Sequence, residues 1–145
     1  GVEAQRILRL EKGHVIIGQD TDLVSNPLEA DMSWVVRFDK DDFIGKAAIL
    51  RLKNTGIRER LVGFELESRV GLEDGSMLVH NGQPAGRVTS VRFSHINGKT
   101  VGMAWVSTEV AEIGGEVQIE HHGHPLTARI VGEAFYDPEG KRVRM

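Results

Sequence analysis

The sequence predicts an α+β protein in which a short mixed α/β segment, residues 1–56, precedes a small antiparallel β-barrel of six or seven strands, residues 57–145. Two observations predict this division. Apolar residues recur at helical spacing mainly before residue 57, and short runs rich in Val, Ile and Thr, separated by turn dipeptides, fill the rest. About 90 residues are enough to close a small barrel, whereas the first segment is too short to bury a core alone.

Helical patterns appear in three places within the first segment. Residues 2–10 and 43–52 place apolar side chains on one helical face, and residues 28–32 form a briefer pattern. Their ends are marked by residues that cap or break helices. The expected end signals are Gly13 for the first helix, Asn26 with Pro27 for the start of the second, and Asp41 or Asp42 with Gly56 for the third. The polar run that finishes at Gly56 also sets the boundary between the two segments.

Two short strands are expected in the same segment. Residues 14–17 form an apolar run after the first helix, and residues 34–38 form a second apolar run. Trp34 opens the second run. A large aromatic side chain in such a strand is expected in the core, where its replacement by alanine costs roughly 3–5 kcal/mol.

The second segment carries hairpin signals. Residues 61–66 alternate as a half-buried strand does. Asn81-Gly82 and Asn97-Gly98 are strong hairpin signals, because both central residues of a type I′ turn need positive φ. Gly114-Gly115 and His122-Gly123 separate the later runs. A closed barrel and a β-sandwich are both compatible with strands of this number and length.

Composition excludes several classes of partner. The formal net charge is −3, and neither segment has a basic surplus, so nucleic acid is not an expected partner. No apolar run approaches the roughly 20 residues that cross a bilayer, so a membrane is not expected either. The sequence has no cysteine. This excludes disulfides and thiolate chemistry and fits a reducing compartment, taken here to be the cytoplasm.

Charged residues of the first segment allow a binding role or a structural one. Arg9 and Glu11 are two positions apart and do not share a helical face, and ion pairs to neighbouring elements are favoured over ligand contact. Asp20, Asp22 and Glu29 lack the spacing and the glycine of a calcium loop. Turns that fold this loop onto itself are therefore favoured over a metal site.

Two groups in the second segment do not predict chemistry. His122 and His124 would face one side of a strand, but they flank an expected turn at Gly123, so a solvated hairpin tip is favoured over a metal site. Ser94 and His95 are neighbours on a strand and point to opposite faces, which excludes a nucleophile–base pair. No catalytic residue and no metal ligand is assigned in this chain.

A set of ordered motifs resembles the glycine-cleavage T-protein (aminomethyltransferase) superfamily. The motifs are LRLEKGH at 8–14, GQDTD at 18–22, NP at 26–27, MSWVV at 32–36, DFIGK at 42–46, GRVTS at 86–90 and VGMAWV at 101–106. Their order and spacing make the resemblance specific, and it covers essentially the whole chain. Within the superfamily, the sequence of residues 11–22 is most similar to that of the α-subunit of heterotetrameric sarcosine oxidases.

The resemblance implies a part in folate-dependent one-carbon transfer. Full-length members bind tetrahydrofolate in a cavity formed by three domains, the last of which is the barrel, and a carboxylate of the first domain assists the chemistry. That carboxylate would precede Gly1. Residues 1–56 would then be the tail of a folate-binding domain, and the chain a C-terminal fragment that closes the cavity without catalysing alone.

The same resemblance indicates partners. These are the missing N-terminal folate-binding domain or a partner subunit, and the folate itself, which is expected to bind the isolated chain weakly or not at all. An apolar face left by the missing partner would favour self-association of the fragment.

Two cofactor-binding positions carry over from the family. Gln5 matches an arginine that contacts folate in aminomethyltransferases, and its amide keeps a hydrogen bond to a carboxylate but not the charged bidentate contact. His14 matches an aromatic residue of some members and would stack or hydrogen-bond. The missing arginine at position 5 supports an alternative function, a non-enzymatic interaction or scaffold module that has lost folate binding.

Overall fold

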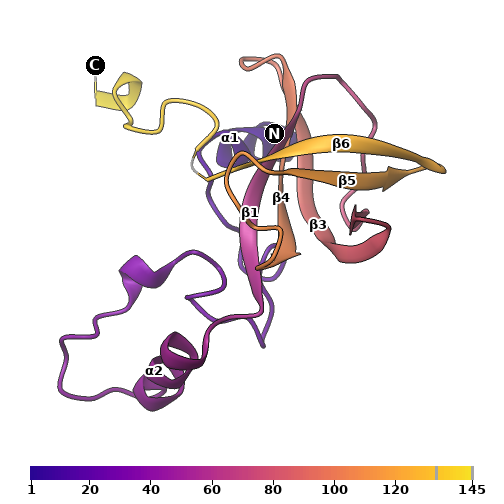
Figure 1. Ribbon diagram of the computed structural model, residues 1–145. Coiled ribbons are helices and arrows are strands. Elements are labelled where there is room, and N and C mark those ends of the chain that lie inside the picture. The colour runs from indigo at the N-terminus through magenta and orange to yellow at the C-terminus, as the bar shows by residue number, and fades with distance from the viewer. Residues whose placement is uncertain (133, 145) are drawn as a thin grey trace.

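The computed structural model describes residues 1–132 and 134–144 and confirms the α+β fold with its antiparallel barrel (Figure 1). The strands are β1 Glu59–Leu66, β2 Met77–His80, β3 Gln83–Ser94, β4 Lys99–Ser107, β5 Glu116–His121 and β6 His124–Val131. Their order around the barrel is β1-β4-β3-β2-β5-β6, and the pairing of β6 with β1 closes it. Neighbouring strands are antiparallel throughout. The architecture is therefore a closed barrel and not a sandwich.

Helices lie outside the barrel. They are α1 Val2–Glu11, the 3₁₀ helix η1 Ser33–Val35, α2 Lys46–Thr55 and the 3₁₀ helix η2 Arg142–Arg144. The first predicted helix is confirmed as α1. The helix predicted from residue 43 begins later, because Gly45, with φ of 93°, is the N-cap of α2 in place of Asp41 or Asp42. Over the described residues, no helix combines the length and the hydropathy that a membrane crossing needs.

Both strands predicted within residues 1–56 are wrong. Residues 14–17 have no strand pairing beyond an isolated bridge between Ile17 and Thr21, and residues 33–35 form η1. A β-strand needs a neighbour that takes up its backbone hydrogen bonds. Within the described residues, the barrel strands pair with one another, and none of them pairs with residues 14–17 or 34–38.

The brief helix predicted over residues 28–32 is a turn. Asn26 caps this turn as expected, because its Oδ1 accepts hydrogen bonds from the backbone N–H groups of Leu28 and Glu29, each at 3.1 Å. The cap signal was correct, and the length of the element was not.

Two hairpin turns form as predicted. Asn81 and Gly82, with φ of 51° and 74°, join β2 to β3, and His122 and Gly123, with φ of 50° and 79°, join β5 to β6. Two consecutive positive φ values are those of a type I′ turn.

The barrel interior is the larger of two apolar clusters. All six strands contribute to it, and Phe64, Leu78 and Ile119 are fully buried there. Gly102 on β4 makes room for Phe64, since a Cβ at that position would lie 2.5 Å from the Cζ atom of the ring. Small barrels commonly fill their interior by setting small residues against large ones.

The second apolar cluster covers the outer face of β4. Val101, Met103 and Trp105 alternate with the inward residues of this strand and pack with Leu10 of α1 and Leu61 of β1. The whole of β4 except its two end residues is therefore buried on both faces. α1 lies against the outside of the barrel, over β3 and β4.

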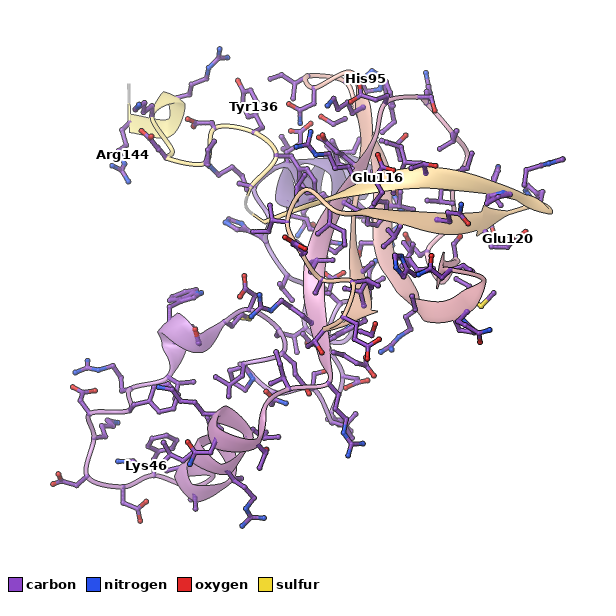
Figure 2. All side chains as sticks on the ribbon, viewed as in Figure 1. Lys46, His95, Glu116, Glu120, Tyr136 and Arg144 are labelled. Atoms are coloured by element: carbon purple, nitrogen blue, oxygen red, sulfur yellow. The ribbon has the colours of Figure 1, made fainter. Side chains whose placement is uncertain are left out.

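Residues 33–56 form a lobe that stands away from the barrel (Figure 1). No residue of η1 or α2 is buried, and the side chain of Ile44 is fully exposed. Figure 2 shows the side chains of the lobe, Lys46 among them, apart from those of the barrel. The prediction that Trp34 belongs to the core is wrong, because this side chain is 78% exposed.

We predict that replacing the two tryptophans changes the free energy of unfolding by very different amounts. Trp105→Ala removes a buried side chain, so the free energy of unfolding should fall by roughly 3–5 kcal/mol. Trp34→Ala removes an exposed side chain and should change it by less than about 0.5 kcal/mol. Thermal and urea unfolding, followed by circular dichroism, measures both values. A large loss of stability in Trp34→Ala would contradict the exposure of the lobe.

Candidate ligand-binding hollow

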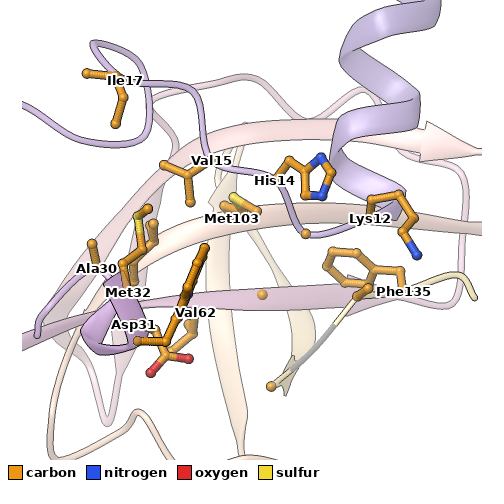
Figure 3. A pocket seen from close by; sticks show the side chains of 16 residues that line it. Lys12, His14, Val15, Ile17, Ala30, Asp31, Met32, Val62, Met103 and Phe135 are labelled. Atoms are coloured by element: carbon orange, nitrogen blue, oxygen red, sulfur yellow. The ribbon is translucent and has the colours of Figure 1, made fainter. Parts of the chain in front are cut away.

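An open hollow of about 410 Å³ lies outside the barrel, between the loop after α1 and the outer face of β1 (Figure 3). Its floor is the outer apolar cluster, to which Val15, Met32 and Met103 contribute. Trp34 and Phe135 add aromatic rings to its lining. A mostly apolar concavity with a few polar groups is the usual form of a small-molecule site.

A glycine allows Phe135 to pack closely on the floor of the hollow. Gly63 on β1 lines the hollow, and a Cβ there would come within 3.1 Å of the Phe135 ring. The chain that carries Phe135 is held against the end of α1, since the N–H of Tyr136 donates to the carbonyl of Glu11 at 2.9 Å and the ammonium group of Lys12 donates to the carbonyl of Asp137.

The two predicted binding residues occupy different places. His14 lines the hollow with an exposed side chain, and Figure 3 shows its imidazole on the same side as Lys12 and Phe135. Gln5 is exposed on α1 and does not line the hollow. The structure therefore brings one of the two positions to the hollow and leaves the other on a neighbouring surface.

A buried ion pair lies behind the wall that carries His14. Arg9 of α1 pairs with Asp20 of the loop, and their side chains are 8% and 0% exposed. The backbone carbonyl of Asp20 also accepts a 2.7 Å hydrogen bond from the indole N–H of Trp105. The prediction that Arg9 is a structural residue is confirmed. Asp20 does fold its own loop, since its Oδ2 accepts a 2.8 Å hydrogen bond from the backbone N–H of Ile16, but it also makes long-range contacts that the expected turn did not include.

A β-bulge in β3 completes this buried network. The register between β3 and β4 shifts between Val88 and Ser90, so Thr89 is an extra residue. A bulge of this kind turns two successive side chains toward one face. The hydroxyls of Thr89 and Ser90 both donate to Oδ1 of Asp20.

Glu11 makes a second buried contact between α1 and β3. Its carboxylate accepts a 2.7 Å hydrogen bond from the hydroxyl of Ser94, and both side chains are buried. This contact is structural, as predicted, although it is a hydrogen bond and not an ion pair. Sequence reasoning missed the roles of Thr89, Ser90 and Ser94.

Asp22, another carboxylate considered as a metal ligand, makes hydrogen bonds within its own loop. Asp22 folds its own loop, because its Oδ1 accepts hydrogen bonds from Val24 and from the N–H and hydroxyl of Ser25. The hydroxyl of Ser25 keeps the pKa of this exposed carboxyl below its usual value. Across residues 1–132 and 134–144, no three His, Asp or Glu side chains gather as metal ligands would.

The tip of the β5–β6 hairpin is solvated, as predicted. His122 and His124 are exposed at the tip of the β5–β6 hairpin, and His121 stacks its ring 4.4 Å from that of His122. His95 is exposed and packs edge-on against Phe93. Neither group forms a nucleophile–base pair.

We predict that Asp20 and Asp22 differ sharply in their contribution to stability. Asp20→Ala leaves the guanidinium of Arg9 buried without its partner, so the free energy of unfolding should fall by roughly 3–5 kcal/mol. Asp22→Ala removes hydrogen bonds within an exposed loop and a long ion pair to Arg87, and should cost much less. Urea unfolding followed by tryptophan fluorescence measures both free energies of unfolding. Equal losses in the two variants would show that the buried contacts of Asp20 do not stabilise the fold.

Comparisons with known proteins match both segments of the chain. Residues 59–137 match the family model of the glycine cleavage T-protein C-terminal barrel domain, and residues 1–40 match that of the GCVT N-terminal domain. The aminomethyltransferase of Synechocystis sp. is 37% identical over 142 residues, which are 97% of this chain and 38% of that protein. The aminomethyltransferase of Rubrobacter xylanophilus is 40% identical over 146 residues, with the same two shares.

A solved structure agrees with these relatives. The crystal structure of glycine cleavage system aminomethyltransferase T from Bartonella henselae has a TM-score of 0.89 and 28% sequence identity to this chain. The match covers 95% of this chain and 39% of that one. The chain thus spans a little over a third of the length of these relatives. By its barrel, its motifs and these matches, the chain belongs to the glycine-cleavage T-protein family.

Proposed function

We propose that this chain forms one wall of the tetrahydrofolate-binding cavity of an aminomethyltransferase of the glycine-cleavage type. The observation that carries this proposal is the composition of the hollow. It is lined by residues of both matched segments, His14 and Met32 from the first and Met103 and Phe135 from the second, and it is open on one side. The part of such an enzyme that corresponds to the remaining length of its relatives would supply the opposite wall.

In this proposal the contribution of the chain is shape. The enzyme would move a one-carbon unit from an amine donor to tetrahydrofolate, through a reactive species that must be held in position and kept from water. An apolar wall with flat aromatic rings suits a planar ligand and excludes water. We assign no catalytic residue to this chain, and we propose that it is inactive alone. The boundary between its two domains is proposed near Gly56.

The two carried-over residues have different proposed roles. His14 stands in the lining of the hollow and would stack on the ligand or hydrogen-bond to it. Gln5 would reach only a part of the ligand that extends beyond the hollow, over the exposed side of α1. The amide of Gln5 would accept or donate a single hydrogen bond there, in place of the bidentate contact of an arginine.

A segment exchange tests the function. We predict that replacing the matched segment of the Rubrobacter xylanophilus aminomethyltransferase with this chain gives a chimera that binds tetrahydrofolate, whereas the isolated chain binds it weakly or not at all. Isothermal titration calorimetry measures both affinities. Transfer of the one-carbon unit by the chimera would then be assayed directly.

A folded chimera that neither binds folate nor transfers the one-carbon unit would contradict the proposal. It would favour the alternative, a non-enzymatic interaction or scaffold module that has lost folate binding. The choice between the glycine-cleavage type and the sarcosine oxidase α type is tested by the amine donor that an active chimera accepts.

We predict that His14→Ala weakens folate binding by the chimera roughly fivefold, the loss expected for one hydrogen bond or stacking contact. His95→Ala is the matched control, because His95 is equally exposed and lies outside the hollow. Titration calorimetry measures the folate affinity of the two variants. Equal affinities in the two variants would remove His14 from the site.

The exposed lobe predicts self-association of the isolated chain. Trp34, Val35 and Ile44 present apolar surface that the missing part of the enzyme would cover. Light scattering should therefore show a mean mass that rises with concentration, and Trp34→Ser combined with Ile44→Ser should reduce the rise. A strict monomer at high concentration would contradict this.

The cytoplasmic location remains a prediction from composition.

A further inference from the structure

The wall of the hollow is fixed from behind by groups that do not line it. Residues 14–17 leave α1 and cross the outer face of the barrel without strand pairing of their own. Backbone hydrogen bonds hold this run locally, from His14 N–H to the carbonyl of Arg9 and from Asp20 N–H to the carbonyl of Ile16, and two contacts with buried charged side chains are added to them. A guanidinium N–H of Arg9 donates to the carbonyl of His14 at 3.2 Å, and the backbone N–H of Ile16 donates to Oδ2 of Asp20 at 2.8 Å.

All acceptor positions of the Asp20 carboxylate are filled. Oδ2 accepts from Arg9 and from the backbone of Ile16, and Oδ1 accepts from the hydroxyls of Thr89 and Ser90. An ionised carboxylate offers about four lone-pair sites, so Asp20 has no freedom to turn. Its orientation therefore fixes the position of the Ile16 amide.

Ser90 holds the guanidinium of Arg9, the partner of Asp20, in place. Its hydroxyl donates to Asp20 and accepts from Arg9 and from the side-chain amide of Gln19, the last at 3.0 Å. A serine hydroxyl has one donor and two acceptor sites, and all three are used. The guanidinium that supports the carbonyl of His14 is thus seated on the bulge of β3.

We propose that the Arg9–Asp20 pair, seated on the Thr89–Ser90 bulge, is a positioning device that fixes His14 and Val15 in the wall of the hollow. None of the four residues of this device lines the hollow. They act by holding the backbone on either side of Val15, which places its side chain against Met103 and the imidazole of His14 at the rim. Only the effect on folate rests on the function proposed above.

The chain contains a matched control for this device. Ser94 lies on the same strand as Ser90, both are buried, and each joins β3 to a charged side chain of α1. Ser94 bonds to Glu11, which makes no hydrogen bond to residues 14–17. A purely structural role predicts the same consequences for both serines, whereas a positioning role predicts a local difference.

Hydrogen exchange in the chain itself tests the positioning. In Ser90→Ala, and in Thr89→Val, the amide of Ile16 should exchange roughly tenfold faster while the amides of β4 keep their protection. Ser94→Ala, and Thr89→Ser, which keeps the hydroxyl, should leave Ile16 unchanged. If Ser90→Ala does not unfold the chain and Ile16 stays as protected as in Ser94→Ala, the proposal is overturned. If Ser90→Ala does not fold, Thr89→Val against Thr89→Ser decides in the same way.

Folate binding by the chimera gives the second readout. Ser90→Ala should weaken the affinity roughly tenfold, and Ser94→Ala should not change it. A chimera that binds no folate before any substitution contradicts the proposed function and leaves the exchange result to judge the positioning. Equal affinities of Ser90→Ala and Ser94→Ala in a binding chimera would show that the device does not set the ligand wall.

Discussion

The buried ion pair between Arg9 and Asp20 is the interaction on which the rest of this structure depends. Removing two charges from water costs more than their attraction returns unless their other hydrogen-bonding positions are also filled. For Asp20 they are filled, by groups from α1, from the loop and from β3. α1, the loop that follows it and the distant strand β3 are therefore held in one arrangement. Within the described residues one gap remains on this pair, because Nε of Arg9 is buried without a partner.

The barrel makes this arrangement possible because β4 is buried on both faces. Its inward residues belong to the closed core, and its outward residues form the surface on which α1 and the loop pack. The segment that precedes the barrel forms no strand, and it packs on the barrel through side chains and through a backbone hydrogen bond, from Leu61 N–H to the carbonyl of Glu29 at 2.8 Å. The bulge at Thr89 then supplies hydroxyls at a point where a regular strand would alternate. The hollow follows from this, since the loop is held above β1 and β4 without filling the space between them.

Sequence reasoning succeeded where local backbone chemistry decides the structure. The turn at His122 needs only two residues with positive φ, and the dipeptide shows them. Asp20 is different, because its partners Thr89 and Ser90 follow 69 and 70 positions later and its own neighbourhood suggested a turn or a metal loop. The prediction that Trp34 is buried was wrong for a different reason. An apolar pattern does not distinguish a core from a surface that another part of a protein covers. His14 was reached only through the family resemblance, and no periodicity indicated the hollow.

The exposed lobe and the open hollow follow from one division of apolar surface. Of residues 1–32, Leu10 and Ala30 are buried on the barrel while Leu23 and Val24 stay exposed, and no residue of η1 or α2 is buried. A ten-residue helix whose apolar side chains are at most half-buried is marginal in water, and in the proposed enzyme a further part of the protein would cover and stabilise the lobe. In the proposed enzyme the covering part also provides the opposite wall of the cavity, and Trp34 belongs both to the lobe and to the lining of the hollow. In that enzyme, covering of the lobe and exclusion of water from the ligand would be one event, while α1, the loop after it and the barrel together fix the wall that receives the ligand.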